Sequence, residues 1–209
     1  MPEITDITPQ VKDKERCNIY VDGRFYCGLK LETAIKNRLK AGEHVDLARL
    51  DEIQLENEKS EALDKAMTHL SVSMKTEKQM RDFLKKKGYV QAVADFVVAK
   101  LEDYGFLDDA EYCRQYLSFA GKNKGRLLLK AELKKRGADE SCIEAALETL
   151  SGEEESARAV LDKYMKNREF TKENLCKAFR HLLSRGFGYD AAKSALSSLG
   201  AEEEGGEEF

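Results

Sequence analysis

The chain repeats itself at an interval of 49 residues, and this periodicity constrains its fold more than any other feature. Gly88, Gly137 and Gly186 share this spacing (137 − 88 and 186 − 137), and each follows a basic residue. The same interval aligns these apolar columns: Leu84, Leu133 and Leu182; Val98, Leu147 and Leu196; Leu101, Leu150 and Leu199; Leu63, Tyr112 and Leu161; Met67, Tyr116 and Met165. Ungapped columns of this kind indicate three tandem repeats.

Each repeat is predicted to contain three helices. The second ends in a basic residue and a glycine, because glycine accepts the left-handed conformation that closes a helix and a cation complements the helix dipole. In the third, apolar residues recur at helical steps, as in Val93, Val97 and Leu101. Thr76 and Gln79 have the spacing of a capping box. Stacked units of this size are expected to share a continuous core in an elongated, curved body.

The first 57 residues have a different pattern. Two β-prone runs, Arg16 to Val21 and Arg24 to Leu29, flank Asp22-Gly23, a dipeptide that favours a two-residue hairpin turn. Residues 31–40 are predicted to form a helix ending before Gly42, and a further helix is expected after Asp46.

The expected fold is therefore all-α, with a small N-terminal β-hairpin and helix before the repeats. The predicted domains are an N-terminal extension at 1–57, three-helix repeats at 58–106, 107–150 and 151–199, and a disordered acidic tail at 200–209. The tail is expected to be disordered because its glycines and glutamates offer little apolar area to bury.

Charge and cysteine content narrow the class of protein. The net charge is −4, but five glutamates in the last ten residues account for it, and the remainder carries about +1. No run of about 18 apolar residues is long enough to span a membrane, and the N-terminus lacks the apolar core of a signal peptide. The five cysteines are widely spaced and include no C-x-x-C, which favours reduced thiols and a cytoplasmic location.

Motifs for catalysis are missing from the sequence. His44, His69 and His181 have no metal-ligand spacing, and no phosphate-binding or nucleophile motif occurs. The pair Asp108-Asp109 precedes a predicted helix, where capping is the simpler interpretation. We therefore expect no catalytic residue, no metal ligand and no cofactor.

Clustered basic residues are the candidates for a binding site. Arg126, Lys130 and Lys134 are spaced i, i+4, i+8 and predict one exposed cationic stripe on a helix, of the kind that neutralises phosphates. A solvated helix face is the simpler alternative. The full set of candidates for contact with DNA or a protein filament is Lys85, Lys86, Lys87, Lys122, Lys124, Arg126, Lys130, Lys134, Lys135, Arg136 and Arg185.

The aromatic residues are predicted to lie in the core. Tyr112, Tyr116 and Phe179 fall on apolar helix faces, and Phe106 and Phe187 follow glycines at helix ends. Base-stacking platforms need exposed aromatics in a basic groove, so sequence-specific base reading is not expected.

Several ordered motifs resemble those of the RecX family of recombinase regulators. They are T-E-K-Q-M-R-D-F-L-K-K-K-G from Thr76, G-F-L-D-D from Gly105, K-G at Lys124 with E-L-K-K-R-G from Glu132, and R-G-F from Arg185. The resemblance covers about residues 58–199. It departs from the family at Ala138, where an apolar β-branched residue is common, and in the acidic tail.

The resemblance implies tandem three-helix repeats, with an N-terminal β-hairpin in some members. It also implies a non-enzymatic regulator that binds the RecA recombinase filament on single-stranded DNA and mostly inhibits ATP hydrolysis and strand exchange, in recombination, DNA repair and the SOS response. Weak double-stranded DNA binding is expected as well. Two alternatives stay open: a DNA-binding protein with helix-turn-helix-like repeats, and a helical-repeat scaffold that binds only proteins.

Overall fold

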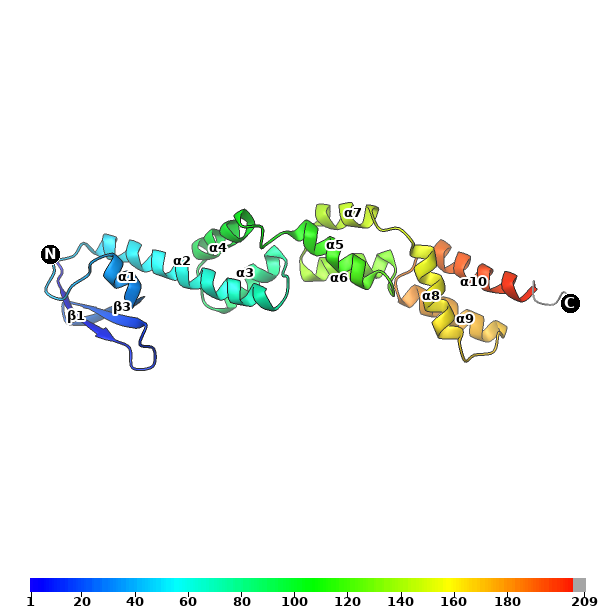
Figure 1. Cartoon of the computed structure of the whole chain (residues 1–209), viewed down its shortest axis with the longest axis horizontal. Helices are drawn as coiled ribbons and strands as arrows, with labels where there is room; N and C mark the ends of the chain where they lie inside the picture. The colour runs from blue at the N-terminus through cyan, green and yellow to red at the C-terminus, as the bar shows by residue number, and fades with distance from the viewer. Residues whose placement is uncertain (205–209) are drawn as a thin grey trace. The chain divides into compact units, whose positions relative to one another are not determined.

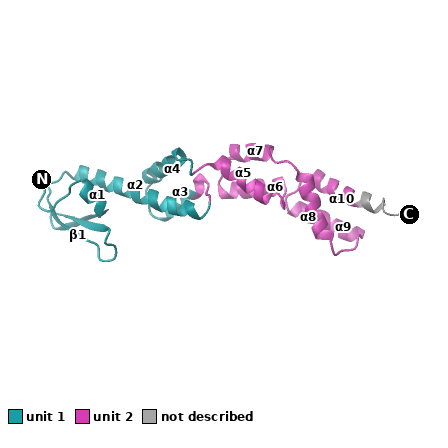
Figure 2. Ribbon diagram, in the orientation of Figure 1, with its two compact units in different colours: residues 1–73, 80–106 teal, residues 74–79, 107–209 magenta. Residues whose placement is uncertain are grey.

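The computed structural model describes residues 1–204 and the side chains as far as Leu199. These residues form two compact units (Figure 2). Unit 1 comprises Met1–Ser73 and Met80–Phe106, and unit 2 comprises Met74–Gln79 and the described residues from Leu107 onward. The elements (Figure 1) are β1 Ile4–Pro9, β2 Arg16–Val21, β3 Arg24–Lys30, α1 Leu31–Lys36, α2 Leu47–Val72, α3 Glu77–Lys86, α4 Gln91–Asp103, α5 Asp109–Ala120, α6 Arg126–Arg136, α7 Glu140–Glu148, α8 Glu153–Met165, α9 Lys172–Ser184 and α10 Tyr189–Glu204.

The N-terminal sheet of unit 1 contains the predicted hairpin and one more strand. β2 and β3 pair antiparallel around Asp22 and Gly23, whose φ angles of 48° and 77° are those of the expected turn. The added strand β1 pairs with β2 at the sheet edge. Its short run contains Asp6 and ends in Pro9, which removes one backbone donor, so the sequence signal for a strand is weak.

The helix predicted at 31–40 is shorter than expected. α1 ends at Lys36, and Arg38 has a φ of 54°, a left-handed conformation that stops the helix before Gly42. The next helix begins where the sequence indicates, since the side chain of Asp46 accepts a hydrogen bond from the amide of Ala48 at 3.1 Å.

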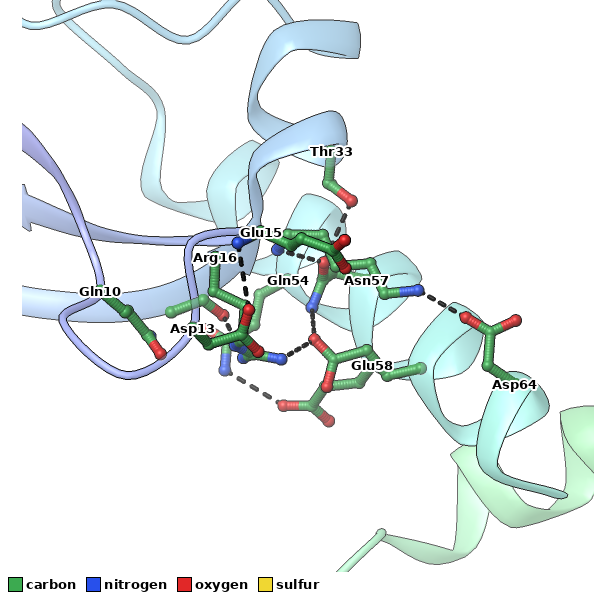
Figure 3. Close-up of polar contacts among 12 residues, drawn as sticks. Gln10, Asp13, Glu15, Arg16, Thr33, Gln54, Asn57, Glu58 and Asp64 are labelled. Carbon is green, nitrogen blue, oxygen red and sulfur yellow. Dashed lines mark hydrogen bonds and ion pairs between the residues drawn. The ribbon is translucent and has the colours of Figure 1, made fainter. Parts of the chain in front are cut away.

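A buried asparagine joins this sheet to α2 (Figure 3). Asn57 is 2% exposed, and its Oδ1 accepts from the Lys30 amide at 2.8 Å and from the Thr33 hydroxyl at 3.0 Å. Its Nδ2 donates to Glu61 at 2.8 Å, and Glu61 also pairs with Arg16 of β2. Because both polar atoms of the amide are bonded, the β2–β3 hairpin, α1 and α2 are held in one arrangement within unit 1.

The three repeats have the predicted number of helices. Repeat 1 consists of the C-terminal half of α2 with α3 and α4, repeat 2 of α5 to α7, and repeat 3 of α8 to α10. α2 is one unbroken helix, so the predicted boundary between residues 57 and 58 falls inside it. α10 continues to Glu204, so the predicted disordered tail does not begin at residue 200; residues 205–209 lie outside the described part of the chain.

The glycine column closes the second helix of every repeat in the same way. Gly88, Gly137 and Gly186 have φ angles of 89°, 78° and 83°. The residue after each glycine donates its amide to the carbonyl of the aligned leucine, as Ala138 does to Leu133 at 3.2 Å. This 6→1 bond, with the 5→2 bond beside it, is the Schellman motif, which glycine permits because it lacks a Cβ.

The first-helix columns fit the repeat less well. Met165 is 3% exposed, whereas Met67, placed in the same column, is 37% exposed. The 49-residue interval therefore aligns equivalent residues on the second and third helices of each repeat. It aligns the first helices less well, because the loops between the first and second helices differ in length.

Within unit 2, the glycine of one repeat packs on the start of the second helix of the preceding repeat. The amides of Gly125 and Leu127 donate to the carbonyls of Arg185 and Gly186 at 3.0 and 3.1 Å. A Cβ on Gly125 would lie 2.2 Å from the Gly186 oxygen, so the two backbones touch. These bonds satisfy amides that α6 leaves unpaired at its N-terminus.

The segment 74–79 repeats this arrangement inside unit 2. Thr76, which lies 49 residues before Gly125, donates its hydroxyl to the carbonyl of Arg136 at 2.8 Å. A Cβ on Gly137 would lie 2.2 Å from the Lys78 side chain. Thr76 and Gln79 also form the predicted capping box, with two reciprocal bonds of 3.2 Å.

Repeats 2 and 3 keep separate hydrophobic cores. Leu129, Leu133 and Ile143 belong to one buried cluster, and Leu161 and Leu182 belong to another. The expectation of a continuous core is therefore wrong in unit 2, where main-chain hydrogen bonds and the contact of Gly186 with Leu128 join two separate buried clusters.

We predict that Gly125→Ala weakens the contact between repeats 2 and 3. Gly125 has an ordinary φ of −79°, so the effect comes from crowding against Gly186, which costs about 1–3 kcal/mol. Hydrogen exchange should show lower protection of the amides at positions 125 and 127. Gly188→Ala is the control, since a Cβ there meets no atom within 4 Å. Unchanged protection in Gly125→Ala would show that the two backbones do not meet.

A second prediction concerns Asn57. Asn57→Ala leaves the Lys30 amide and the Thr33 hydroxyl without their buried acceptor, at a cost of about 1–3 kcal/mol. The unfolding midpoint should fall well below that of Gln54→Ala, because Gln54 bonds to Glu58 on the same helix. Equal midpoints for the two variants would contradict the role given to Asn57.

Candidate functional site

The predicted basic residues are divided between the two units. Lys85 and Lys86 form the last turn of α3 and Lys87 follows it, all in unit 1. The other eight belong to unit 2, on the α5–α6 loop, on α6 and at the end of α9.

The cationic stripe of α6 exists, but its charges are paired. Arg126 lies 3.3 Å from Glu153 of α8, Lys130 pairs with Glu144 of α7, and Lys134 pairs with Glu140 of α7. The stripe is therefore not the bare row of positive charge that the sequence of α6 predicts.

The pairing also shifts the pKa values of these groups. The hydrogen bond to Glu144 raises the pKa of Lys130, and the hydrogen bond from Lys134 lowers the pKa of Glu140. Both shifts favour the charged forms, as expected for groups that contact an opposite charge.

Lys124 and Arg136 belong to a polar cluster around Tyr116. Lys124 donates to both oxygens of Glu132, at 2.6 and 2.7 Å, and the hydroxyl of Tyr116 donates to the same carboxylate. The guanidinium of Arg136 lies 4.6 Å from the centre of the Tyr116 ring. Burial and the bond to Glu132 raise the pKa of Tyr116. This cluster stabilises the packing of α5 on α6. Lys124 and Arg136 therefore already have partners within the chain.

The remaining cations are more available to a partner. Lys85, Lys86, Lys122, Lys135 and Arg185 are exposed and make no ion pair with another described residue. In unit 2 the main-chain bond from Gly125 to Arg185 brings Arg185 to the start of α6. Lys122 lines a cavity of about 170 Å³ with Lys124, Ser151 and Glu153.

Not every aromatic residue is where the sequence places it. Tyr112 and Phe187 are buried as predicted, at 8% and 1% exposure. Phe106 is 53% exposed, and its ring meets that of Tyr104 edge to face at 6.2 Å. The helix before Phe106 ends in left-handed Gly105, which turns the chain so that this ring faces solvent.

The sequence interpretation also missed a column of residues that face the first helix. Phe83, Glu132 and His181 are 49 residues apart on the second helices. Phe83 stacks on His69 with centroids 4.1 Å apart, and His181 stacks on Tyr164 at 4.4 Å. In repeat 2 the corresponding group is the Glu132 carboxylate beside Tyr116. The 49-residue spacing contains the signal for this column, but its three members share neither apolar nor basic character.

Basic side chains accompany these contacts. Lys87 lies 5.6 Å from the Phe83 ring centre, and Arg168 lies 3.9 Å from that of Tyr164. Burial, with the charges of Arg185 and Arg168, lowers the pKa of His181 below its ordinary value. This shift favours the neutral form of the imidazole that is stacked on Tyr164.

Among residues 1–204, no group of three or more His, Cys, Asp or Glu side chains is placed to hold a metal ion. None of the helices in this range is long and apolar enough to cross a bilayer.

Three family models match consecutive parts of the chain. They describe the N-terminal domain of regulatory protein RecX at residues 2–46, the first RecX three-helix domain at 62–101 and the second at 108–147. These ranges correspond to the N-terminal sheet with α1, to repeat 1 and to repeat 2.

Relatives of similar length carry the same name. Regulatory protein RecX of Bacillus licheniformis is 32% identical over all of this chain and 81% of its own length. That of Clostridium tetani is 30% identical over 94% of both chains.

Solved structures agree in fold. A crystal structure of regulatory protein RecX superposes with a TM-score of 0.67 at 24% identity, covering 92% of this chain and 98% of that one. RecX from Lactobacillus salivarius gives a TM-score of 0.63 at 23% identity over 69% of this chain and 97% of its own. With its sheet, its repeats and its relatives in agreement, the chain belongs to the RecX family of regulatory proteins.

Proposed function

We propose that this chain binds the RecA recombinase filament on single-stranded DNA and restrains its ATP hydrolysis and strand exchange. It binds double-stranded DNA more weakly, acts in the cytoplasm and performs no reaction of its own. Membership of a family named for regulation, matched over the whole chain, is the observation that carries the proposal.

The charged surface supports this function. Lys85, Lys86, Lys122, Lys135 and Arg185 present cationic groups that are not engaged by acids of the described chain, so they can meet phosphates or acidic protein side chains at low cost. They lie near helix ends, and all of them except Lys122 stand within three residues of a Schellman glycine.

The helix-turn-helix alternative fits the geometry poorly. A recognition helix inserts its N-terminal residues into the major groove. In unit 2 the start of α6 is packed against Arg185, Gly186 and Glu153, and the segment that starts α3 is packed against Arg136 and Asp109. Neither helix start is open to base edges.

The alternative of a helical-repeat scaffold that binds only proteins predicts a different experimental result. A scaffold that binds no DNA should bind the recombinase with the same affinity whether or not DNA is present. Co-sedimentation of the full chain with RecA, with and without single-stranded DNA, tests the proposal directly. Retention that requires the filament is expected, and equal retention without DNA would favour the scaffold.

We predict that replacing unpaired lysines affects DNA binding more than replacing paired ones. The variant Lys86→Gln/Lys122→Gln/Lys135→Gln should bind single-stranded DNA more weakly. The slope of log affinity against log salt should become shallower by about 0.7 for each phosphate that no longer has a lysine beside it. Fluorescence anisotropy of a labelled oligonucleotide between low and moderate salt measures both quantities.

A variant of equal charge provides the control. Arg126→Gln/Lys130→Gln/Lys134→Gln removes three cations that already contact Glu153, Glu144 and Glu140. Its salt slope should stay near that of the parent, while inhibition of RecA ATP hydrolysis is measured in parallel. A larger change of the salt slope in this control than in the lysine variant would show that Arg126, Lys130 and Lys134 of α6 contact the DNA phosphates instead.

A further inference from the structure

A groove in unit 1 has a chemistry that the basic residues alone do not explain. It is open to solvent, lies between α2 and α3 and has a volume of about 480 Å³. Lys65, His69 and Val72 of α2 line one side, and Phe83 and Lys87 line the other. We refer to these five residues as the α2–α3 groove.

The floor of the groove is a pair of stacked rings. The imidazole of His69 and the ring of Phe83 are nearly parallel, at 5°, with centroids 4.1 Å apart. Both side chains are half-buried, so the stack is held in place yet reaches the surface. Val72 is 82% exposed and extends the apolar surface. A flat aromatic ligand can continue such a stack at little entropic cost.

The charge of the groove favours a polyanion. The ammonium groups of Lys87 and Lys65 lie 5.6 Å and 5.2 Å from the ring centres of Phe83 and Tyr89. Asp64, which also lines the groove, is paired with Lys30 at 2.6 Å, and this bond raises the pKa of Lys30. Lys65 also donates to the hydroxyl of Tyr89 at 2.8 Å, and neither Lys65 nor Lys87 forms an ion pair with another described residue, so both ammonium groups can still contact phosphate.

In repeat 2 the residues equivalent to Phe83 and Lys87 are occupied by contacts within the chain. The residue corresponding to Phe83 is Glu132, which is held by Lys124 and by Tyr116. The residue corresponding to Lys87 is Arg136, which lies over Tyr116. A carboxylate at this point repels phosphate and offers no ring to a base, so the repeat frame is shared while the binding chemistry is not.

We propose that the α2–α3 groove binds single-stranded DNA by stacking an unpaired base on the His69–Phe83 pair while Lys65 and Lys87 contact the flanking phosphates. This inference rests on the DNA-binding part of the proposed function and assigns it a site. Base stacking of this kind tolerates any sequence, because every base has a π-face.

The chain contains no tryptophan, which allows a direct test. Phe83→Trp keeps a ring in the stack and introduces one indole whose fluorescence a stacked base quenches. Titration of the full chain with oligo(dT) should quench this emission. An abasic strand with the same number of phosphates should bind more weakly and leave the emission unchanged. Phe25→Trp, at a 60% exposed position in the N-terminal sheet, should not respond to either strand.

Affinity measurements complete the test. Phe83→Leu retains apolar packing and should weaken oligo(dT) binding by about five-fold or more while leaving binding of the abasic strand unchanged. Lys65→Gln/Lys87→Gln, which alters exposed side chains, should weaken binding of both strands. Circular dichroism of each variant establishes that the fold is retained.

The outcomes separate the site from the function. Quenching by oligo(dT) and not by the abasic strand supports the groove. Parent-like DNA affinity with unquenched emission from position 83 overturns the groove and leaves the proposed function intact. Absence of DNA binding by the parent, measured by anisotropy, overturns both the groove and the DNA-binding part of the function, and the RecA co-sedimentation then judges the rest.

Discussion

The closure of the second helix at a left-handed glycine is the constraint on which the repeats depend. The 6→1 bond at Gly88, Gly137 and Gly186 requires a positive φ, which residues with a Cβ adopt at a cost of about 1–2 kcal/mol. In unit 2, Gly137 and Gly186 also lack the Cβ that would collide with Lys78 or with Leu128. Glycine at these positions thus allows the last carbonyls of the helix to be hydrogen-bonded. It also permits the close approach of the neighbouring chain segment.

This closure also determines where positive charge is displayed. Lys87, Arg136 and Arg185 stand one residue before the glycines, at the C-terminal end of the helix dipole. In unit 2 the main-chain carbonyls of Arg136 and Arg185 accept hydrogen bonds from the segment that starts a second helix. The carbonyl of Arg136 accepts from the Thr76 hydroxyl, and that of Arg185 accepts from the Gly125 amide. The side chain of Arg136 lies over the Tyr116 ring, whereas that of Arg185 is exposed, so the same main-chain role at the junction is combined with different side-chain surroundings.

A common frame with different side chains explains how similar repeats differ in chemistry. At the position shared by Phe83, Glu132 and His181, repeat 1 has a stacked phenyl ring, repeat 2 a carboxylate held by Lys124, and repeat 3 an imidazole whose pKa burial and nearby arginines lower. The backbone closure tolerates all three because these side chains pack toward the first helix and not toward the junction. Each repeat can therefore change its contact surface without changing its fold.

The repeat, its glycine closures, the Asp22-Gly23 hairpin and the capping box at Thr76 could all be predicted from the sequence, because each depends on contacts within a few residues or on a fixed period. The sequence could not predict in this way which basic side chains remain without an ion pair and can contact a partner. Arg126, Lys130 and Lys134 share a face by helical spacing, but the acids that pair with them come from α7 and α8, at separations in sequence that no local pattern encodes. The meeting of His69 and Phe83 was equally hidden, since a ring stack between two helices depends on how they pack. Local geometry fixes the scaffold, whereas long-range packing fixes which side chains remain exposed to act.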